Sequence, residues 1–268
     1  MKILFCGDVV GKSGRKMVLT LVPQLKEKLS LDAVIVNGEN AAHGFGLTPK
    51  MYDEFLAHGA DVITLGNHSF DKKEIFTILD SAEFLVRPLN YPDGTAGHGY
   101  CIKRLANGKR LAVVQLLGKL FMRQYNDPFE MMDKWIEAHK GEYDILVIDY
   151  HAEATAEKVA FGWKMNGIAT LVVGTHTHIP TADAHVLDGG TAYMTDVGMC
   201  GDYASVIGQK VDCSLSRFKV GEKIQRLDPA EKEGTFCGVV VEIDDATNRA
   251  TKVFPVRIGA HLENTHEI

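Results

Sequence analysis

A series of short apolar runs, each ending in polar side chains, restricts the fold more than any other feature of the sequence. The runs are short and rich in β-branched residues, which favours buried strands over helices. Five of them cover Lys2–Gly7, Ala33–Gly38, Val62–Gly66, Ile145–Tyr150 and Leu171–Gly174. Helical patterns cover Arg15–Leu29, Lys50–His58, Lys72–Leu79 and Met131–Lys140. Strand–helix alternation in the first half predicts βαβ units with a partly parallel sheet.

The second half of the sequence has less regular alternation. Arg110–Leu116, Ala192–Asp196 and Phe236–Ile243 are predicted strands without regular intervening helices, which favours a second, more antiparallel sheet. Predicted loops cover Tyr91–Gly99, Lys119–Phe129 (expected near the active site) and, as a surface excursion, Lys219–Gly234. The length of 268 residues and a hydrophobic content of 46% fit one domain over residues 1–268.

Charge and cysteine content exclude some classes of protein. A net charge of −6 argues against broad binding to nucleic acid or anionic membranes, so no stable nucleic-acid complex is expected. It leaves room for a small phosphorylated substrate, because bound metal ions supply positive charge locally. No segment approaches the roughly 20 apolar residues that span a bilayer. The five cysteines are scattered, which indicates reduced thiols and a cytoplasmic protein.

The polar residues that follow the five strands are all able to bind metal. They are Asp8, Glu39 and Asn40, Asn67 and His68, His151, and His176 and His178. Each taken alone has an ordinary interpretation as a helix cap, a turn residue or a hydrogen-bonded histidine. Ligands gather beyond the carboxyl ends of strands in α/β sheets, so together these residues predict a metal site. Their mixture of oxygen and nitrogen donors suits Zn, Mn or Fe.

The donors are too numerous for one ion. A four- or five-coordinate ion needs three or four protein groups plus water. One bridging carboxylate could hold two ions about 3.5–4 Å apart, the separation typical of metal-assisted phosphoryl chemistry. The sequence therefore predicts a dinuclear centre in which a metal-bound hydroxide attacks phosphorus.

Composite motifs resemble a known superfamily. GDVVG at Gly7–Gly11, NGEN at Asn37–Asn40, GNHSFD at Gly66–Asp71 and GTHTH at Gly174–His178 are similar to motifs of the calcineurin-like metallophosphoesterases. GDVVGKSGR, NGENAAHGFGLT, DYHAEAT and TDVGMCG more narrowly resemble the YmdB-like bacterial phosphodiesterases, over Lys2 to about Ile258. This resemblance implies an α/β fold in which two mixed sheets pack as a sandwich flanked by helices.

Two positions depart from the wider superfamily. Its first motif is Asp-x-His, whereas Asp8 is followed by Val9 and Val10, and its second motif centres on Asp rather than on Glu39 and Asn40. The YmdB-like branch shares both changes. Its pattern implies that Asp8, Glu39, Asn40 and His178 hold one ion, and that Glu39, Asn67, His151 and His176 hold the other. The resemblance implies Fe or Mn, with Zn as a further candidate.

Other residues have predicted roles around this centre. His68 is the expected general acid, outside the metal shell, with Asp71 or a backbone carbonyl orienting its ring. Glu153 is a candidate partner of a histidine ligand. Weaker candidates for substrate contact are Thr177, His43, Arg87 and His98, and Thr177 also has a purely structural interpretation.

The resemblance implies a phosphodiesterase acting on small cyclic nucleotides, 2′,3′-cyclic species first and 3′,5′-cAMP second. The loss of the first-motif histidine directs the expected substrate away from phosphoproteins. The alternatives are a phosphomonoesterase, a nuclease for short RNA, or a nucleotide-sensing regulatory protein with incidental turnover. Members of such families often form homo-oligomers, so a homo-oligomer is one of the possible states and the sequence leaves the oligomeric state open.

Overall fold

Two six-stranded sheets form the centre of the computed structural model, which describes residues 1–221 and 223–266. The first sheet, in the order β14–β13–β1–β3–β4–β5, comprises β1 (Lys2–Cys6), β3 (Ala33–Asn37), β4 (Val62–Thr64), β5 (Leu85–Val86), β13 (Thr235–Ile243) and β14 (Ala250–Gly259). The second, in the order β10–β11–β9–β8–β7–β6, comprises β6 (Tyr100–Arg104), β7 (Arg110–Leu117), β8 (Ile145–His151), β9 (Leu171–Thr175), β10 (His185–Val186) and β11 (Ala192–Met194). The short strands β2 (Asp8–Val9) and β12 (Met199–Cys200) pair separately.

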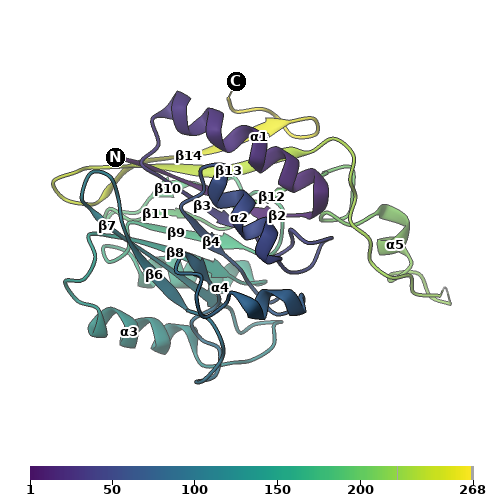
Figure 1. Cartoon of the computed structure of the whole chain (residues 1–268), viewed down its shortest axis with the longest axis horizontal. Coiled ribbons are helices and arrows are strands. Elements are labelled where there is room, and N and C mark those ends of the chain that lie inside the picture. Colours follow the sequence, from purple (N-terminus) through teal and green to yellow (C-terminus); the bar gives the residue numbers. More distant parts are fainter. Residues whose placement is uncertain (222, 267–268) are drawn as a thin grey trace.

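Helices cover the outer faces of the two sheets (Figure 1). Apolar residues of α1 (Gly11–Leu29), α2 (Pro49–Ala57) and the 3₁₀ helix η1 (Lys73–Thr77) pack on the first sheet. Those of α3 (Pro128–Ala138) and α4 (Thr155–Lys164) pack on the second. The short α5 (Val211–Leu215) lies on a segment that projects from the body.

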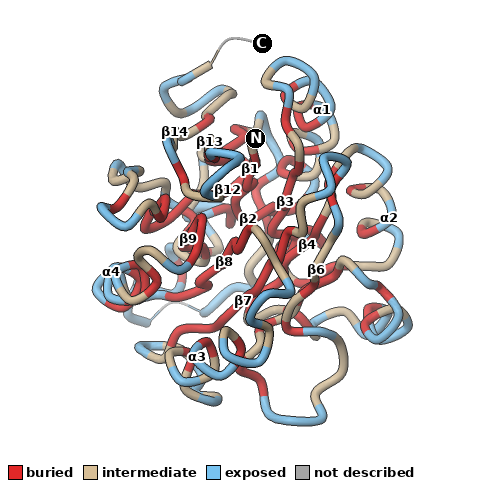
Figure 2. The backbone as a smooth tube through the Cα atoms, turned by 90° about the vertical axis from the view of Figure 1, so that its left-hand side faces the viewer, coloured by how far each residue is buried: buried red, intermediate tan, exposed pale blue. Residues whose placement is uncertain are grey.

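The strands are buried on both faces, which explains why their sequences are continuously apolar. In β1, Ile3 and Phe5 point into the layer between the sheets, whereas Leu4 and Cys6 point toward the helices of the first sheet. Figure 2 shows this as an interior of buried strands enclosed by partly exposed helices. The expected sandwich of two mixed sheets flanked by helices is thus confirmed.

Most of the expected elements are present. Thr48 caps α2 by accepting a hydrogen bond from the Met51 amide at 3.4 Å, and Pro49 follows it in the first turn. The helix expected over Lys72–Leu79 is a short 3₁₀ helix instead. Helix α4 was not expected, because Glu157 and Lys158 interrupt its apolar face. Residues around the expected excursion Lys219–Gly234 are mostly exposed, and its residue 222 lies outside the described residues.

The expectation of a more antiparallel second sheet is wrong. Strands β7, β8, β9 and β11 run parallel, and only the edge strands β6 and β10 pair antiparallel. Helices α3 and α4 provide the crossovers that parallel pairing needs. The predicted strand at Phe236–Ile243 belongs to the first sheet, where it pairs antiparallel with β1. That the chain forms one domain over residues 1–268 remains a prediction.

None of the helices within residues 1–221 and 223–266 is both long enough and apolar enough to cross a membrane.

Candidate metal centre

The carboxyl ends of strands from both sheets meet at one place. Asp8 follows β1, Glu39 and Asn40 follow β3, and Asn67 follows β4, all in the first sheet. His151 ends β8, and His176 and His178 follow β9, all in the second sheet. The His151 Nε2 atom lies 3.2 Å from Glu39 Oε1 and 2.9 Å from Asn67 Oδ1, so the two sheet edges touch here.

Two groups of donor atoms overlap at one carboxylate. Glu39, His151 and His176 form the first group, and Asp8, Glu39 and His178 form the second. Within each group the donor atoms lie within 4.8 Å of one another, close enough to hold a metal ion. Glu39 belongs to both groups, as a bridging ligand must.

Hydrogen bonds fix the tautomers of the histidines. Thr175 Oγ1 donates to Asp149 Oδ1 at 2.6 Å, so it accepts from His151 Nδ1 at 2.8 Å. His178 Nδ1 donates to the Ile207 carbonyl at 2.8 Å. In the neutral form of each imidazole, Nε2 therefore carries the lone pair that could bind a cation.

His176 brings a further imidazole to the same place. Its Nε2 atom lies 3.2 Å from a Glu153 carboxylate oxygen, an ion-pair distance. Its Nδ1 atom lies 3.1 Å from His151 Nε2, and which of the two nitrogens donates depends on the tautomer. The two imidazoles meet beside the Glu39 carboxylate, so a metal ion placed there could bind all three residues.

Unpaired buried oxygens support the same fit. Among the described residues, neither Asp8 Oδ1 nor Asn40 Oδ1 has a hydrogen-bond partner, and both side chains are buried. The Asn40 amide nitrogen donates to the Gly44 carbonyl at 3.0 Å, which leaves its oxygen as the free donor atom. Buried polar atoms of this kind are costly unless a ligand satisfies them.

Gly66 leaves space for the donors. A Cβ atom at this position would lie 2.1 Å from Glu39 Oε2 and 2.7 Å from His151 Nε2. Any other residue would displace the Glu39 carboxylate or the His151 imidazole. The glycine of the GNH motif therefore has a steric reason to be there.

The charged groups of the cluster shift one another's pKa values. Burial alone would lower the pKa of His151, but the carboxylates of Glu39 and Asp8 outweigh it and raise that pKa to about 9. Burial and the positive charge of His151 lower the pKa of His176 to about 3. Burial raises the pKa of Asp8 well above its usual range, whereas His151 holds that of Glu39 below it. The carboxylates thus draw positive charge into the position that a cation would take.

The loop that carries two histidines has an unusual backbone. His176 and His178 have φ values of 93° and 65°, in the left-handed region that non-glycine residues rarely adopt. Asp196 supports the loop by accepting hydrogen bonds from the Thr177 amide and hydroxyl, at 3.2 and 2.6 Å. The buried Lys158 ammonium pairs with the same carboxylate at 2.7 Å. Backbone strain held by its surroundings is common at functional sites.

A buried network behind the centre was not expected from the sequence. Asp149 accepts hydrogen bonds from Asn37, Thr64, Gln115 and Thr175, which join strands of both sheets. A lone carboxylate inside the apolar run ILVIDYH was the available signal. Through Thr175 this network orients His151.

Some of the residues that were expected around the centre lie there. His68 Nδ1 lies 2.8 Å from Asp71 Oδ2, and the His68 amide donates to Glu39 Oε2 at 3.2 Å. Glu153 contacts His176, as expected. The Thr177 hydroxyl is directed to Asp196, in line with its structural interpretation.

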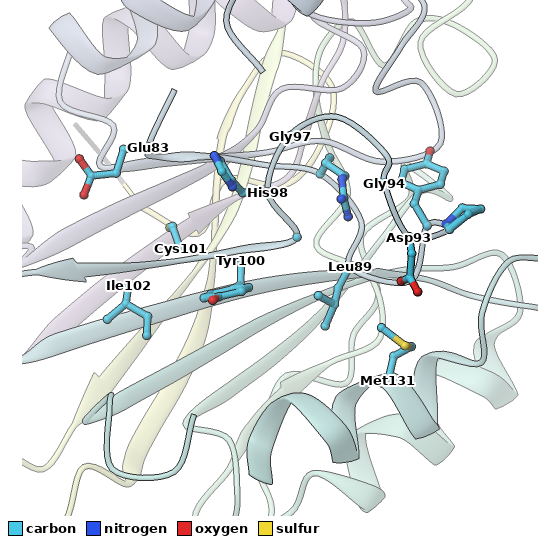
Figure 3. Close-up of a pocket in the computed structure, with 14 residues that line it drawn as sticks. Glu83, Leu89, Asp93, Gly94, Gly97, His98, Tyr100, Cys101, Ile102 and Met131 are labelled. Atoms are coloured by element: carbon cyan, nitrogen blue, oxygen red, sulfur yellow. The ribbon is translucent and has the colours of Figure 1, made fainter. Parts of the chain in front are cut away.

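Three weaker candidates lie elsewhere. His43 pairs with Asp228 at 3.1 Å. Arg87 donates to the carbonyls of Pro88, Thr95 and Ala96 and so holds a loop. Together with His98 it lines a separate pocket of about 520 Å³, which none of the seven expected metal ligands lines (Figure 3).

Stacked mixed sheets with carboxylates and imidazoles at a shared edge are the features expected of a phosphoester hydrolase of the metallophosphoesterase type. The chain belongs to the YmdB-like protein family, whose model matches residues 4–256. It is 49% identical over 259 residues to the 2′,3′-cyclic-nucleotide 2′-phosphodiesterase of Bacillus subtilis (strain 168), covering 97% of each chain.

Two solved structures with 39% and 36% sequence identity share the fold. A hypothetical protein from Thermus thermophilus has a TM-score of 0.90 and 39% identity, covering 97% of this chain and 99% of that one. A novel phosphatase from Mycoplasma pneumoniae also has a TM-score of 0.90, with 36% identity over 97% of this chain and 93% of that one.

Proposed function

We propose that the chain is a dinuclear metal-dependent phosphodiesterase that hydrolyses 2′,3′-cyclic nucleotides at the 2′ bond. The observation that carries the proposal is the sharing of Glu39 between two groups of donors. The activity named for the Bacillus subtilis relative, at 49% identity, supports the choice of substrate. Asp8, Asn40 and His178 would complete one ion's ligand set, and Asn67, His151 and His176 the other's.

The chemistry follows from the residues around that centre. When bound, two cations would activate a water molecule and neutralise the phosphodiester charge. The water oxygen bonds to phosphorus, the bond from phosphorus to the 2′ oxygen breaks, and that oxygen takes a proton. His68 is the proton donor, because Asp71 holds its Nδ1 at 2.8 Å and leaves Nε2 for the substrate. The product is a nucleoside 3′-phosphate.

A substrate panel with metal analysis tests this proposal. Protein purified without oxygen should contain two ions per chain and prefer 2′,3′-cAMP over 3′,5′-cAMP, bis-p-nitrophenyl phosphate and p-nitrophenyl phosphate. Preference for the monoester p-nitrophenyl phosphate would instead identify a phosphomonoesterase. Tight nucleotide binding without turnover would identify a sensing protein.

The metal is iron or manganese, with zinc as the further candidate in this proposal. The mixed carboxylate, amide and imidazole donors suit these metals. Elemental analysis of protein purified without oxygen decides among them, and reloading chelated protein with each metal should restore activity with the native one.

The proposal also covers the cellular location of the protein and its oligomeric state. A cytoplasmic protein fits the five cysteines, which are all free thiols, four of them buried. A homo-oligomer fits the projecting segment around α5, where Phe218, Val220 and Ile224 are exposed. Light scattering on the purified protein should give a mass above 29.5 kDa.

A further inference from the structure

A second hollow opens directly beside the candidate metal centre. It has a volume of about 340 Å³, and two proposed metal ligands, Asn67 and His176, form part of its wall. The rest of the wall comes from β7 and the loop that follows it, with Leu117, Phe121, Met122, Arg123 and Tyr125. A small molecule that contacts the metal centre can therefore extend into this hollow.

The loop is anchored at both ends. At the first end, the amides of Lys119 and Leu120 donate to the two carboxylate oxygens of Glu157, at 2.8 and 3.0 Å. At the other end, the buried Asn90 side chain donates to the Asn126 carbonyl at 3.0 Å, and the Asn126 amide donates back to the Asn90 carbonyl at 3.0 Å. The segment between them is thus held over the centre.

An aromatic contact ties the same segment to the metal-binding motif. The Tyr125 ring lies edge-on to Tyr91, with ring centres 4.6 Å apart. The Tyr91 hydroxyl donates to the Gly66 carbonyl at 3.2 Å, and Gly66 immediately precedes Asn67. The position of the loop is therefore fixed relative to the ligands.

Phe121 and Arg123 are both exposed side chains of this loop. Phe121 is 90% exposed and has a φ of 62°, a strained conformation for a non-glycine residue. Single exposed apolar side chains are common, but a strained one lining a pocket at a reactive centre is not. Among the described residues, the Arg123 guanidinium has no carboxylate partner and lies 5.5 Å from the Tyr125 ring centre.

We propose that this hollow is the nucleobase subsite of the enzyme, with Phe121 as the stacking face and Arg123 as the cation that attracts the phosphodiester. Aromatic faces stack on any base, and arginine pairs with phosphate oxygens. The subsite would thus accept all four bases with little discrimination. This inference rests on the proposed function, because it places the base of the same substrate.

Two substrates with and without a base test the subsite. The metal-loaded enzyme is compared on 2′,3′-cAMP and on glycerol 1,2-cyclic phosphate, which has the five-membered diester but no base. Phe121→Ala should raise KM about 10-fold for 2′,3′-cAMP and leave KM for the glycerol diester unchanged. Leu120→Ala, at a neighbouring exposed side chain outside the hollow, is the control and should change neither.

Replacing Arg123 should change KM in a different way. Arg123→Ala should raise KM for both diesters, because both carry the phosphate, and it should weaken the salt dependence of binding. Gln124→Ala, at an exposed neighbour outside the hollow, is the matched control. An effect of Arg123→Ala on the nucleotide alone would overturn the phosphate role.

Binding measurements separate the subsite from the activity. Calorimetry with adenosine 3′-monophosphate should show about 10-fold weaker binding to Phe121→Ala than to the wild type. If the wild type hydrolyses neither diester, the proposed activity fails, and this binding result still decides the subsite. If the wild type hydrolyses 2′,3′-cAMP and Phe121→Ala has unchanged KM and affinity, the subsite is wrong.

Discussion

The two sheets contribute different donor atoms to the candidate centre. The first sheet supplies oxygen, from Asp8, Glu39, Asn40 and Asn67, whereas the second supplies nitrogen, from His151, His176 and His178. Each donor group combines residues from both sheets. Neither donor group lies within a single sheet, so an ion bound there would link the two sheets across the edge of the sandwich.

The largest effect is expected at Glu39, the residue on which the two groups overlap. Glu39→Gln should reduce the content of both ions and lower turnover by roughly 10⁴-fold, because both groups lose their shared carboxylate. Elemental analysis and kcat on 2′,3′-cAMP measure this. Glu74→Gln, at an exposed glutamate on η1, is the control. Two tightly held ions in Glu39→Gln would refute the bridging role.

A smaller effect is expected where only one group is broken. His178→Ala should leave the group of Glu39, His151 and His176 intact, so the chain should hold one ion instead of two. Turnover should fall roughly 10³-fold, since charge neutralisation is lost on one side of the phosphate. His185→Ala, at an exposed histidine on β10, should hold two ions. Loss of both ions from His178→Ala would show that the two groups do not bind independently.

His68 lies in neither group and contacts the centre through its amide. His68→Ala should keep both ions and lower kcat about 10²-fold, because only the proton donor is removed. If His68→Ala keeps full activity at full metal occupancy, His68 is not the general acid. Asp71→Asn should lower kcat less, since the ring stays and only its orienting carboxylate changes.

The smallest effect is expected at Thr175, which orients the ligand His151 from behind. Thr175→Val removes the hydroxyl that accepts from His151 Nδ1 and donates to Asp149. Metal affinity should weaken about 10-fold, as is usual when a ligand loses its orienting partner. Competition with a chelator of known affinity measures the change, and the exposed Thr20→Val is the control. Unchanged affinity would show that Thr175 serves the fold only.

Much of the fold could be predicted from local signals. The apolar runs predicted the strands that carry ligands, and the helical pattern over Lys50–His58 predicted α2. The pairing of the second sheet could not be predicted, because the polar residues of α4 concealed the crossover between β8 and β9. Because no helix was predicted between β8 and β9, nothing in the sequence indicated the crossover that parallel pairing needs.

The sequence by itself determined which residues reach the strand ends and that their chemistry suits metal, since strand length and donor type are local properties. Tertiary structure decided which donors share an ion site, because this depends on how the two sheet edges meet. It also decided the tautomers of the histidines through distant partners such as Thr175 and Ile207. The hollow beside Phe121 likewise exists only because Glu157 and Asn90, far from that loop in sequence, hold it over the centre.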